Sequence, residues 1–296
     1  MTAAPPRIAG VFAPITTPFD AAGDFAPAAH ARNVARLLAD GLAGIVVSGS
    51  TGEAPLLDLD EQRRLVAGTV DALTDGAWLV AGTGGESTRQ TIALTRAAAA
   101  EGAHAALVRP PGYFSTGVTP ATLADHYRAV ADASPIPVLV YNIPKYTHLA
   151  LAPGLLLQLV GHPNIVGVKD SSGDVKNLAA YREAAPKWSV LVGSGSLLYA
   201  ALELGCDGGI VGLACYMARR CVELVTAFRS GDRQAAGALQ ERLAPLDKEI
   251  VGKLGPAGVK AAMDAVGGGL TGGPVRPPLA PLSAADRERV AQLVAA

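Results

Sequence analysis

Short apolar segments recur along most of the chain, and a stretch with helical spacing follows each of them. A strand buried on both faces is continuously apolar, so these segments are typical of a parallel sheet covered by helices. We expect strands at residues 11–19, 44–48, 77–81, 105–108, 137–141, 165–169, 189–193 and 208–213. Eight such α/β units, repeating every ~20 to 35 residues, predict a (β/α)8 TIM barrel. An open doubly wound sheet is the alternative, but fewer strands are expected in that fold.

The pattern changes after the eighth segment. Helical spacing continues, with no strand between, at residues 217–228, 233–251, 259–265 and 283–294. A Gly/Pro-rich stretch, 267–281, precedes the last of these helices. Because no charge run or low-complexity linker separates this tail, we expect a subdomain that packs on the barrel or on another subunit. We therefore divide the chain into a catalytic barrel, 1–229, and a C-terminal helical subdomain, 230–296.

One lysine differs from the other six in its surroundings. Lys169 ends the apolar segment 165–169, whereas the others lie in polar helical or loop-like stretches. Buried amines are rare. Lys169 is therefore either half of a structural ion pair or an amine held for chemistry. Burial favours the neutral amine, which is the nucleophile that forms a Schiff base with a ketone.

The active site of a TIM barrel lies at the carboxyl ends of its strands. Few polar residues are expected there, namely Ser48 to Glu53 after the second strand, Tyr113 after the fourth, Tyr141 ending the fifth, Lys169 ending the sixth, and Gly193 and Ser194 after the seventh. A lysine and a tyrosine together in an apolar barrel suit Schiff-base chemistry, in which the tyrosine hydroxyl carries protons. The alternative for Tyr141 is an aromatic residue at the barrel rim with a hydrated hydroxyl.

Strand alternation predicts which side chains meet. It places Ile165, Gly167 and Lys169 on one face of the sixth strand, where Gly167 would leave room beneath the amine. Leu139 and Tyr141 share a face of the fifth strand. If both faces point into the barrel, Tyr141 points at Lys169.

Two glycine-rich turns could bind anions. The turn 49–53 precedes a helix, and its N–H groups and two hydroxyls could hold a carboxylate or phosphate, although an ordinary strand-to-helix turn is the equal alternative. It lacks the GK[ST] ending of a P-loop. The turn 82–87 imitates a dinucleotide fingerprint but has Ser87 in place of the third glycine, so we interpret it as an ordinary turn.

The remaining sequence features disfavour several classes of protein. The histidines show no HxH or HExxH spacing, so we expect neither a metal nor another cofactor. The GxSxG motif of serine hydrolases is absent from the sequence. A formal net charge of −1 gives no reason to expect nucleic acid as a partner. The sequence has no apolar run of the ~20 residues that cross a membrane.

The cysteines and the first residues bear on the compartment. The three cysteines, Cys206, Cys215 and Cys221, form no CxxC pair and are typical of reduced thiols. Residues 1–6 lack the basic and apolar regions of a signal peptide. We therefore expect a cytoplasmic protein that does not associate with membranes.

Three motifs together resemble the signatures of the dihydrodipicolinate synthase / N-acetylneuraminate lyase family. They are residues 49–53, 141–144 and 167–174, in that order on the second, fifth and sixth strands. The resemblance covers nearly the whole chain. It implies a (β/α)8 barrel, usually a homotetramer built as a dimer of dimers, that forms a Schiff base with pyruvate or another 2-oxo acid without a metal.

The resemblance also implies a role for individual residues. Lys169 matches the Schiff-base lysine and Tyr141 the proton shuttle. Ser50 and Thr51 match the residues that hold the substrate carboxylate, and the Ser50 hydroxyl also matches a member of the proton relay. Tyr113 matches the relay tyrosine contributed by a neighbouring subunit. Further substrate contacts are expected at Gly49, Ser171, Gly193 and Val211.

Departures from the family pattern bear on the part of the substrate that lies beyond the 2-oxo acid group. Dihydrodipicolinate synthases carry an arginine where Tyr146 stands, which counts against that activity, although the neighbouring Lys145 could substitute in part. Neuraminate lyases carry acidic residues where Gly195 and Ser196 stand. Gly112 replaces a second tyrosine of many members, so we expect an opened pocket wall there.

Several scaffold segments, such as 81–88, 162–167 and 272–279, look most like 4-hydroxy-2-oxoglutarate aldolases. We therefore expect an aldolase that releases pyruvate from a 4-hydroxy-2-oxo acid. The alternatives are a 2-keto-3-deoxy sugar acid aldolase or dehydratase, or 4-hydroxy-tetrahydrodipicolinate synthase. A barrel that binds 2-oxo acids without turnover is a remote alternative, because the residues needed for chemistry are all present.

Overall fold

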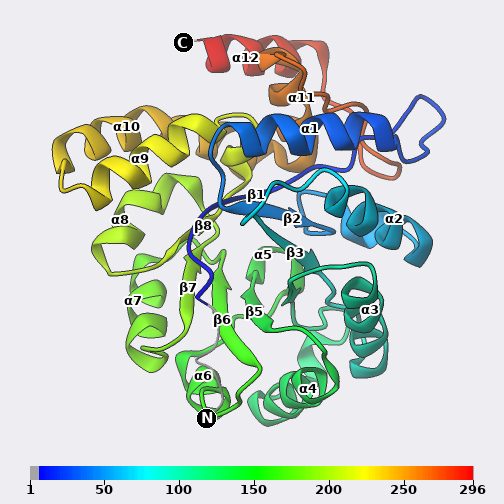
Figure 1. Ribbon diagram of the computed structural model, residues 1–296, viewed down its shortest axis with the longest axis vertical. Coiled ribbons are helices and arrows are strands. Elements are labelled where there is room, and N and C mark those ends of the chain that lie inside the picture. The colour runs from blue at the N-terminus through cyan, green and yellow to red at the C-terminus, as the bar shows by residue number, and fades with distance from the viewer. Residues whose placement is uncertain (1–6, 296) are drawn as a thin grey trace.

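Eight parallel strands form a closed barrel surrounded by helices in the computed structural model, which describes residues 7–295 (Figure 1). Each strand pairs with its neighbours in the sequence, and β1 pairs with β8 to close the sheet. The strands are β1 (Gly10–Pro14), β2 (Gly44–Val47), β3 (Trp78–Gly82), β4 (Ala105–Val108), β5 (Val138–Asn142), β6 (Ile165–Asp170), β7 (Ser189–Val192) and β8 (Gly208–Ile210). The predicted TIM barrel is confirmed.

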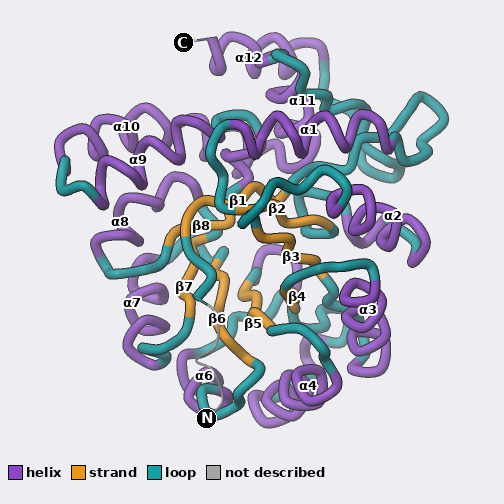
Figure 2. The backbone as a smooth tube through the Cα atoms, in the orientation of Figure 1, coloured by secondary structure: helices purple, strands orange, loops and turns teal. Residues whose placement is uncertain are grey.

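Helices alternate with these strands and then continue into the C-terminal region (Figure 2). The helices are α1 (Pro27–Ala39), α2 (Leu59–Val70), α3 (Thr88–Ala100), α4 (Pro120–Ala133), α5 (Pro144–Thr147), α6 (Pro153–Leu159), α7 (Val175–Ala184), α8 (Leu198–Glu203), α9 (Ala218–Arg229), α10 (Arg233–Leu246), α11 (Gly255–Val266) and α12 (Ala284–Ala295). Between residues 7 and 295, no helix is both long and apolar enough to pass through a membrane.

Local sequence signals determine where several helices begin. The side chains of Asp58, Ser87 and Thr119 each accept a hydrogen bond from a backbone N–H in the first turn of the helix that follows. Such caps satisfy donors that a helix leaves without partners at its start. Pro120 follows one of these caps, at a position where its missing N–H has no cost.

Two prolines explain why the first strand is shorter than expected. We predicted a strand at 11–19, but β1 ends at Pro14. Proline has no N–H to donate to a neighbouring strand, so Pro14 and Pro18 are poor residues for the interior of a sheet. The chain is instead buried and irregular at 15–19, and a mostly exposed turn at 20–24 leads on toward α1.

The core has two layers, one on each side of the strands. Inside the barrel, side chains such as Phe12, Val46, Leu139, Leu191 and Ile210 pack together. Outside it, apolar residues of the strands and helices form a second, larger cluster. Because both faces of each strand are buried, the strands are continuously apolar in sequence.

One expectation about β6 is wrong. Val138 pairs with Ile165 and Leu139 pairs with Gly167, so Val166 is an extra residue and forms a β-bulge. As a result Ile165 packs outside the barrel and Val166 packs inside it. The space beside Gly167 is not open either, because a Cβ atom there would lie 2.6 Å from the Leu139 Cδ2 atom.

The C-terminal region covers part of the barrel mouth. The helix predicted at 233–251 is divided, because α10 contains Pro245 and a π-helix, Asp247–Leu254, follows it. Proline interrupts regular helical hydrogen bonding, and π-turns are frequent at functional sites. Figure 1 shows α12 beyond α1, on the side that faces away from the strands, and α11 packs against α12 and the π-helix. The division of the chain at residue 229 stays a prediction.

Candidate active site

A cavity of about 240 Å³ lies at the carboxyl ends of the strands. Strand ends form one part of its wall, and the π-helix and α11 form another through Asp247, Val251, Gly252 and Val259. Six residues that the sequence nominated line it together, namely Ser50, Thr51, Tyr141, Lys169, Ser171 and Gly193. Strands β2, β5, β6 and β7 therefore bring these residues to one place.

Lys169 lies beside Tyr141 in this cavity. The two residues are directly paired between β5 and β6, and the Lys169 Nζ atom lies 4.2 Å from the centre of the Tyr141 ring. Only 4% of Lys169 and 5% of Tyr141 is exposed. Among residues 7–295, no carboxylate forms an ion pair with Lys169. Lys169 was interpreted either as half of a structural ion pair or as an amine held for chemistry. The structural ion pair is not found among these residues.

A hydrogen-bond network that sequence reasoning missed fixes the ends of the same two strands. The Asn142 Nδ2 atom donates to Asp170 Oδ1 across 2.7 Å, and the backbone N–H and hydroxyl of Ser172 also donate to the Asp170 carboxylate. The N–H of Leu151 donates to Asn142 Oδ1. Because Asn142 and Asp170 directly follow Tyr141 and Lys169, this network orders the backbone that presents the tyrosine and the amine.

The turn after β2 brings Ser50 and Thr51 to the cavity in a constrained conformation. Ser48 and Glu53 have φ angles of 52° and 58°, in the left-handed region that residues other than glycine rarely adopt. Such strain persists only where surrounding contacts hold it. The Thr17 hydroxyl donates to the Gly52 carbonyl across 2.7 Å, which is one of these contacts.

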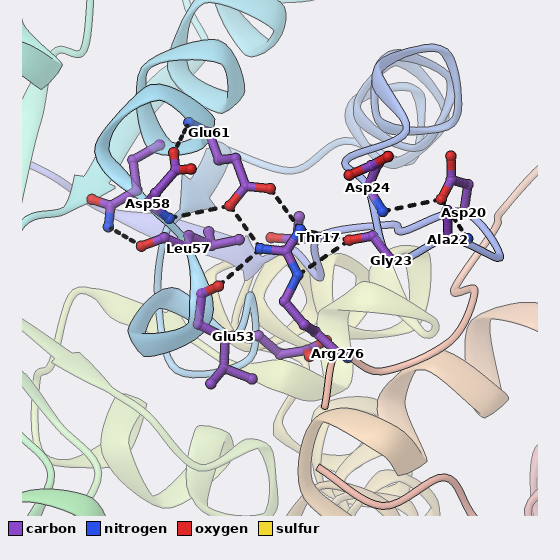
Figure 3. Close-up of polar contacts among 12 residues, drawn as sticks. Thr17, Asp20, Ala22, Gly23, Asp24, Glu53, Leu57, Asp58, Glu61 and Arg276 are labelled. Atoms are coloured by element: carbon purple, nitrogen blue, oxygen red, sulfur yellow. Dashed lines mark hydrogen bonds and ion pairs between the residues drawn. The ribbon is translucent and has the colours of Figure 1, made fainter. Parts of the chain in front are cut away.

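Glu53 anchors this turn to the C-terminal region. Its carboxylate, 2% exposed, pairs with the Lys260 Nζ atom at 2.6 Å and accepts the N–H of Arg276 at 2.9 Å. Figure 3 shows Arg276 extended between Glu53 and Glu61, and its guanidinium makes two parallel hydrogen bonds with Glu61. We expected every lysine other than Lys169 to have polar surroundings, which is wrong for Lys260, since only 1% of it is exposed.

These charges shift one another's ionisation. Burial lowers the pKa of Lys260, against the opposing effect of its ion pair with Glu53. The hydrogen bonds from Arg276 lower the pKa of Glu61. The sequence pointed to Glu53 only through its place in the turn motif. Its partners lie more than 200 residues away, and no local pattern identifies them.

Three nominated residues lie away from the cavity lining. Val211 packs between the barrel and its helices, while the adjacent Ile210 and Gly212 line the cavity. The Gly49 carbonyl accepts the N–H groups of Gly52 and Ala54 within the turn. Tyr113 is 82% exposed and its ring packs against Phe114, so it does not reach the cavity of its own chain.

Of the residues that depart from the family pattern, some line the cavity and Gly112 does not. Lys145 and Tyr146 line the cavity, and the Lys145 Nζ atom donates to the Gly252 carbonyl across 2.9 Å. Gly112 is not part of the lining, because the backbone of Thr147 in α5 packs beside it. The open wall that we expected at Gly112 is therefore absent from this cavity.

Glu86 holds the loop that presents Tyr113. Its Oε2 atom accepts the N–H groups of Gly112 and Tyr113 at 2.9 and 3.0 Å, and its Oε1 atom pairs with Arg109 at 2.8 Å. Partial burial raises the pKa of Glu86, but these two N–H groups and Arg109 together lower it below the ordinary value. The charged clamp is therefore complete at neutral pH and is lost only as the pH falls through the lowered pKa.

The family resemblance implies that Tyr113 belongs to the proton relay, so we expect Glu86→Ala to lower kcat by about tenfold with a smaller change in KM, because Tyr113 loses its fixed position. Steady-state assays of the aldol cleavage that the resemblance implies measure this change. Glu101→Ala is the matched control, since Glu101 forms a comparable pair with Arg63 away from the cavity. An unchanged kcat in Glu86→Ala would mean that the reaction does not depend on how this loop is held.

Known proteins match this chain along its whole length. A model of the dihydrodipicolinate synthetase family matches residues 7–296. The chain belongs to this family. It is 37% identical to a 4-hydroxy-tetrahydrodipicolinate synthase of Methanothrix thermoacetophila, with 93% of this chain and 92% of that protein covered. It is 38% identical to a probable mitochondrial 4-hydroxy-2-oxoglutarate aldolase of Emericella nidulans, with 94% and 91% covered.

Solved structures of the family have the same fold. The dihydrodipicolinate synthase DapA-2 of Bacillus anthracis superimposes with a TM-score of 0.92 at 28% identity, with 97% of this chain and 98% of that chain covered. YagE of Escherichia coli K12, solved in complex with pyruvate, has a TM-score of 0.92 at 27% identity with the same coverage. The chain is thus an enzyme of the aldolase and lyase class, as its membership of the family predicts.

Proposed function

We propose that this enzyme cleaves a 4-hydroxy-2-oxo acid, such as 4-hydroxy-2-oxoglutarate, to pyruvate and an aldehyde through a Schiff base on Lys169. One observation carries the proposal: a buried amine, with no ion-pair partner within the described part of the chain, lies against Tyr141 in the cavity at the barrel mouth. A primary amine held beside a tyrosine in a cavity is placed to attack a carbonyl carbon as a nucleophile.

The reaction follows from these side chains. The Lys169 amine attacks the C2 carbonyl carbon of the substrate, and the adduct takes the Tyr141 hydroxyl proton on its oxygen and loses water, which gives an iminium and a Tyr141 oxygen that can accept a proton. Tyr141 takes the proton of the C4 hydroxyl, the C3–C4 bond breaks, and its electron pair moves into the iminium as an enamine while the aldehyde leaves. The enamine takes a proton at C3. Water then hydrolyses the iminium, which releases pyruvate and restores the amine.

The turn at Ser50 and Thr51 supplies the second requirement, a site for the substrate carboxylate. Both residues line the cavity, and their hydroxyls and their own N–H groups, which the hydrogen bonds within the turn do not use, are donors suited to an anion. We assign the C1 carboxylate of the substrate to this turn. The iminium itself accepts the electrons of the broken bond, so the proposed cycle needs no metal.

The second half of the substrate is assigned from Lys145, Tyr146 and the relatives. Lys145 is a cation at the cavity wall and can pair with a second carboxylate, as in 4-hydroxy-2-oxoglutarate. The chain is also 37% identical to a 4-hydroxy-tetrahydrodipicolinate synthase, which makes that reaction the second candidate. Tyr146 at the expected arginine position counts against it. Pyruvate release from a panel of 4-hydroxy-2-oxo acids, beside condensation of pyruvate with aspartate semialdehyde, separates the two.

We further propose that the enzyme works as a homotetramer in which Tyr113 completes the site of a neighbouring subunit. Its support is the exposed pair Tyr113 and Phe114, which lies outside the cavity of its own chain. Large aromatic side chains exposed together are typical of a surface that contacts a partner.

Borohydride reduction in the presence of pyruvate tests the Schiff base directly. We expect one reduced pyruvyl group on Lys169, located by peptide mass mapping, and none when pyruvate is omitted. Lys260 is an internal control, because it is equally buried but held by Glu53. A protein that gains no adduct, or gains it on another lysine, would refute the assignment.

A further inference from the structure

The buried ion pair between Glu53 and Lys260 lies just behind the cavity and has no part in the reaction proposed above. Both residues are almost fully buried, and the Lys260 Nζ atom lies 2.6 Å from Glu53 Oε1. Glu53 ends the turn that carries Ser50 and Thr51, and Lys260 directly follows Val259, which lines the cavity. The pair therefore adjoins the cavity lining on both of its sides.

The backbone of the turn connects Glu53 to the residues that face the substrate. The N–H of Glu53 donates to the Ser50 carbonyl across 3.2 Å. A Cβ atom at Gly52 would lie 2.9 Å from the Ile15 carbonyl oxygen, so the turn packs closely against the chain that follows β1. Because of these contacts, a shift of Glu53 also shifts Ser50 and Thr51.

The C-terminal region determines where the Glu53 side chain lies. One of its carboxylate oxygens pairs with Lys260, and the other accepts the N–H of Arg276 at 2.9 Å. Lys260 is fixed in turn, because its Nζ atom also donates to the Pro274 carbonyl and lies 4.3 Å from the centre of the Phe19 ring. Charge-assisted hydrogen bonds are short and strong, so these partners leave Glu53 little freedom to move.

A role in stability alone accounts poorly for this pair. Taking two charges out of water is costly, and apolar residues in place of a buried ion pair often leave a protein equally or more stable. Glu53 also has a φ angle of 58°, which costs free energy for a residue other than glycine. A fixed position for the turn is what the buried charge and the strained backbone together supply.

We propose that Glu53 and Lys260 are positioning residues that set the affinity of the turn at Ser50 and Thr51 for the substrate carboxylate. Neither Glu53 nor Lys260 lines the cavity, so both act through the turn. They hold its donors in place, so that the carboxylate binds without first having to order them. The inference rests on the Schiff-base cleavage proposed above and on the carboxylate that we assign to this turn. The C-terminal region then takes part in substrate binding through a residue outside the cavity lining.

Two ketones that differ in the carboxylate test this inference. Pyruvate and acetone can both form a Schiff base with Lys169, but only pyruvate has a carboxylate for the turn. Borohydride trapping, with the adduct on Lys169 measured by peptide mass mapping, gives the half-saturating concentration of each ketone, which should be far lower for pyruvate in the wild-type enzyme. In Glu53→Gln we expect this concentration to rise about tenfold for pyruvate and to stay unchanged for acetone, because the hydrogen bonds from the turn to a charged group are weakened.

The double variant Glu53→Gln with Lys260→Met separates position from stability. Because no unpaired charge remains in the core, it should unfold closer to the wild type and yet keep the raised half-saturating concentration for pyruvate. Asp207→Asn is the matched control. Asp207 is another buried carboxylate, and it pairs with Arg7 and Arg182 just before β8, at the end of the barrel opposite the cavity. This control should lose stability without a change in the half-saturating concentration of either ketone.

A purely structural role for the pair would lower the amount of adduct at saturation with both ketones and shift neither half-saturating concentration. That result in Glu53→Gln, or an equal shift for both ketones, would overturn the inference. Wild-type affinity for pyruvate in the double variant would overturn it too, and this variant decides the matter if Glu53→Gln does not fold. A wild-type enzyme that gains no adduct with pyruvate would overturn the inference together with the Schiff base, so the two failures can be told apart.

Discussion

Replacing Lys169 with alanine should lower pyruvate release from 4-hydroxy-2-oxo acids by about 10⁴-fold or more, because the covalent intermediate cannot form. The protein should remain folded. Lys169 has no ion-pair partner among residues 7–295, so its removal leaves no buried charge uncompensated. A coupled assay for pyruvate and a thermal unfolding curve measure the two effects.

Two further variants isolate the chemistry of the amine. Lys169→Met keeps most of the side-chain volume, and Lys169→Arg keeps a long basic side chain that cannot act as a Schiff-base amine. All three variants should be equally inactive if nucleophilicity is what matters. Lys145 also lines the cavity. Because this lysine is exposed, we expect that it cannot replace the buried amine of Lys169. Activity above about 1% of wild type in Lys169→Ala would contradict the proposed mechanism.

The second large effect concerns stability. Glu53→Gln should reduce the free energy of unfolding by about 3–5 kcal/mol, because Lys260 would be left buried without its partner and must either keep its charge there or give up its proton. The Pro274 carbonyl, which accepts from the Lys260 Nζ atom at 2.6 Å, cannot neutralise the charge. Urea denaturation at fixed protein concentration measures the change.

The double variant Glu53→Gln with Lys260→Met removes both charges of the ion pair. It distinguishes this loss from the loss of Glu53 alone, which leaves Lys260 buried without a partner. With both charges removed, much of the lost stability should return, since no uncompensated charge remains in the core. Glu101→Gln breaks a more exposed pair with Arg63 and should change the free energy of unfolding little. If Glu53→Gln unfolds at the same urea concentration as wild type, the buried pair does not anchor the turn.

The fold could be predicted because it depends on a repeated local pattern. Continuous apolar segments identify buried parallel strands, and their number predicts a closed barrel. Chain order then places Tyr141 beside Lys169 without further information. The β-bulge at Val166 could not be predicted in this way, because it depends on how two strands pair and not on the alternation within one.

The residues that support the site were harder to predict. Asp247, Lys260 and Arg276 lie in the C-terminal helices and the segment between them, and their local sequence is typical of exposed polar residues. They reach the barrel mouth only because the tail folds back over it. Sequence periodicity reports which face of an element is apolar, but it does not report which distant segments meet.

The tie between Glu53 and Arg276 has a consequence for the order in which the enzyme is made. Ser50 and Thr51 leave the ribosome early, whereas the segment that holds their turn is synthesised more than 200 residues later. Domains start to fold during synthesis from the N-terminus. The barrel can therefore begin to assemble on the ribosome, but the turn acquires its anchor only after Lys260 and Arg276 have emerged. A nascent chain that lacks these two residues would carry Lys169 and Tyr141 beside a turn that is not yet anchored.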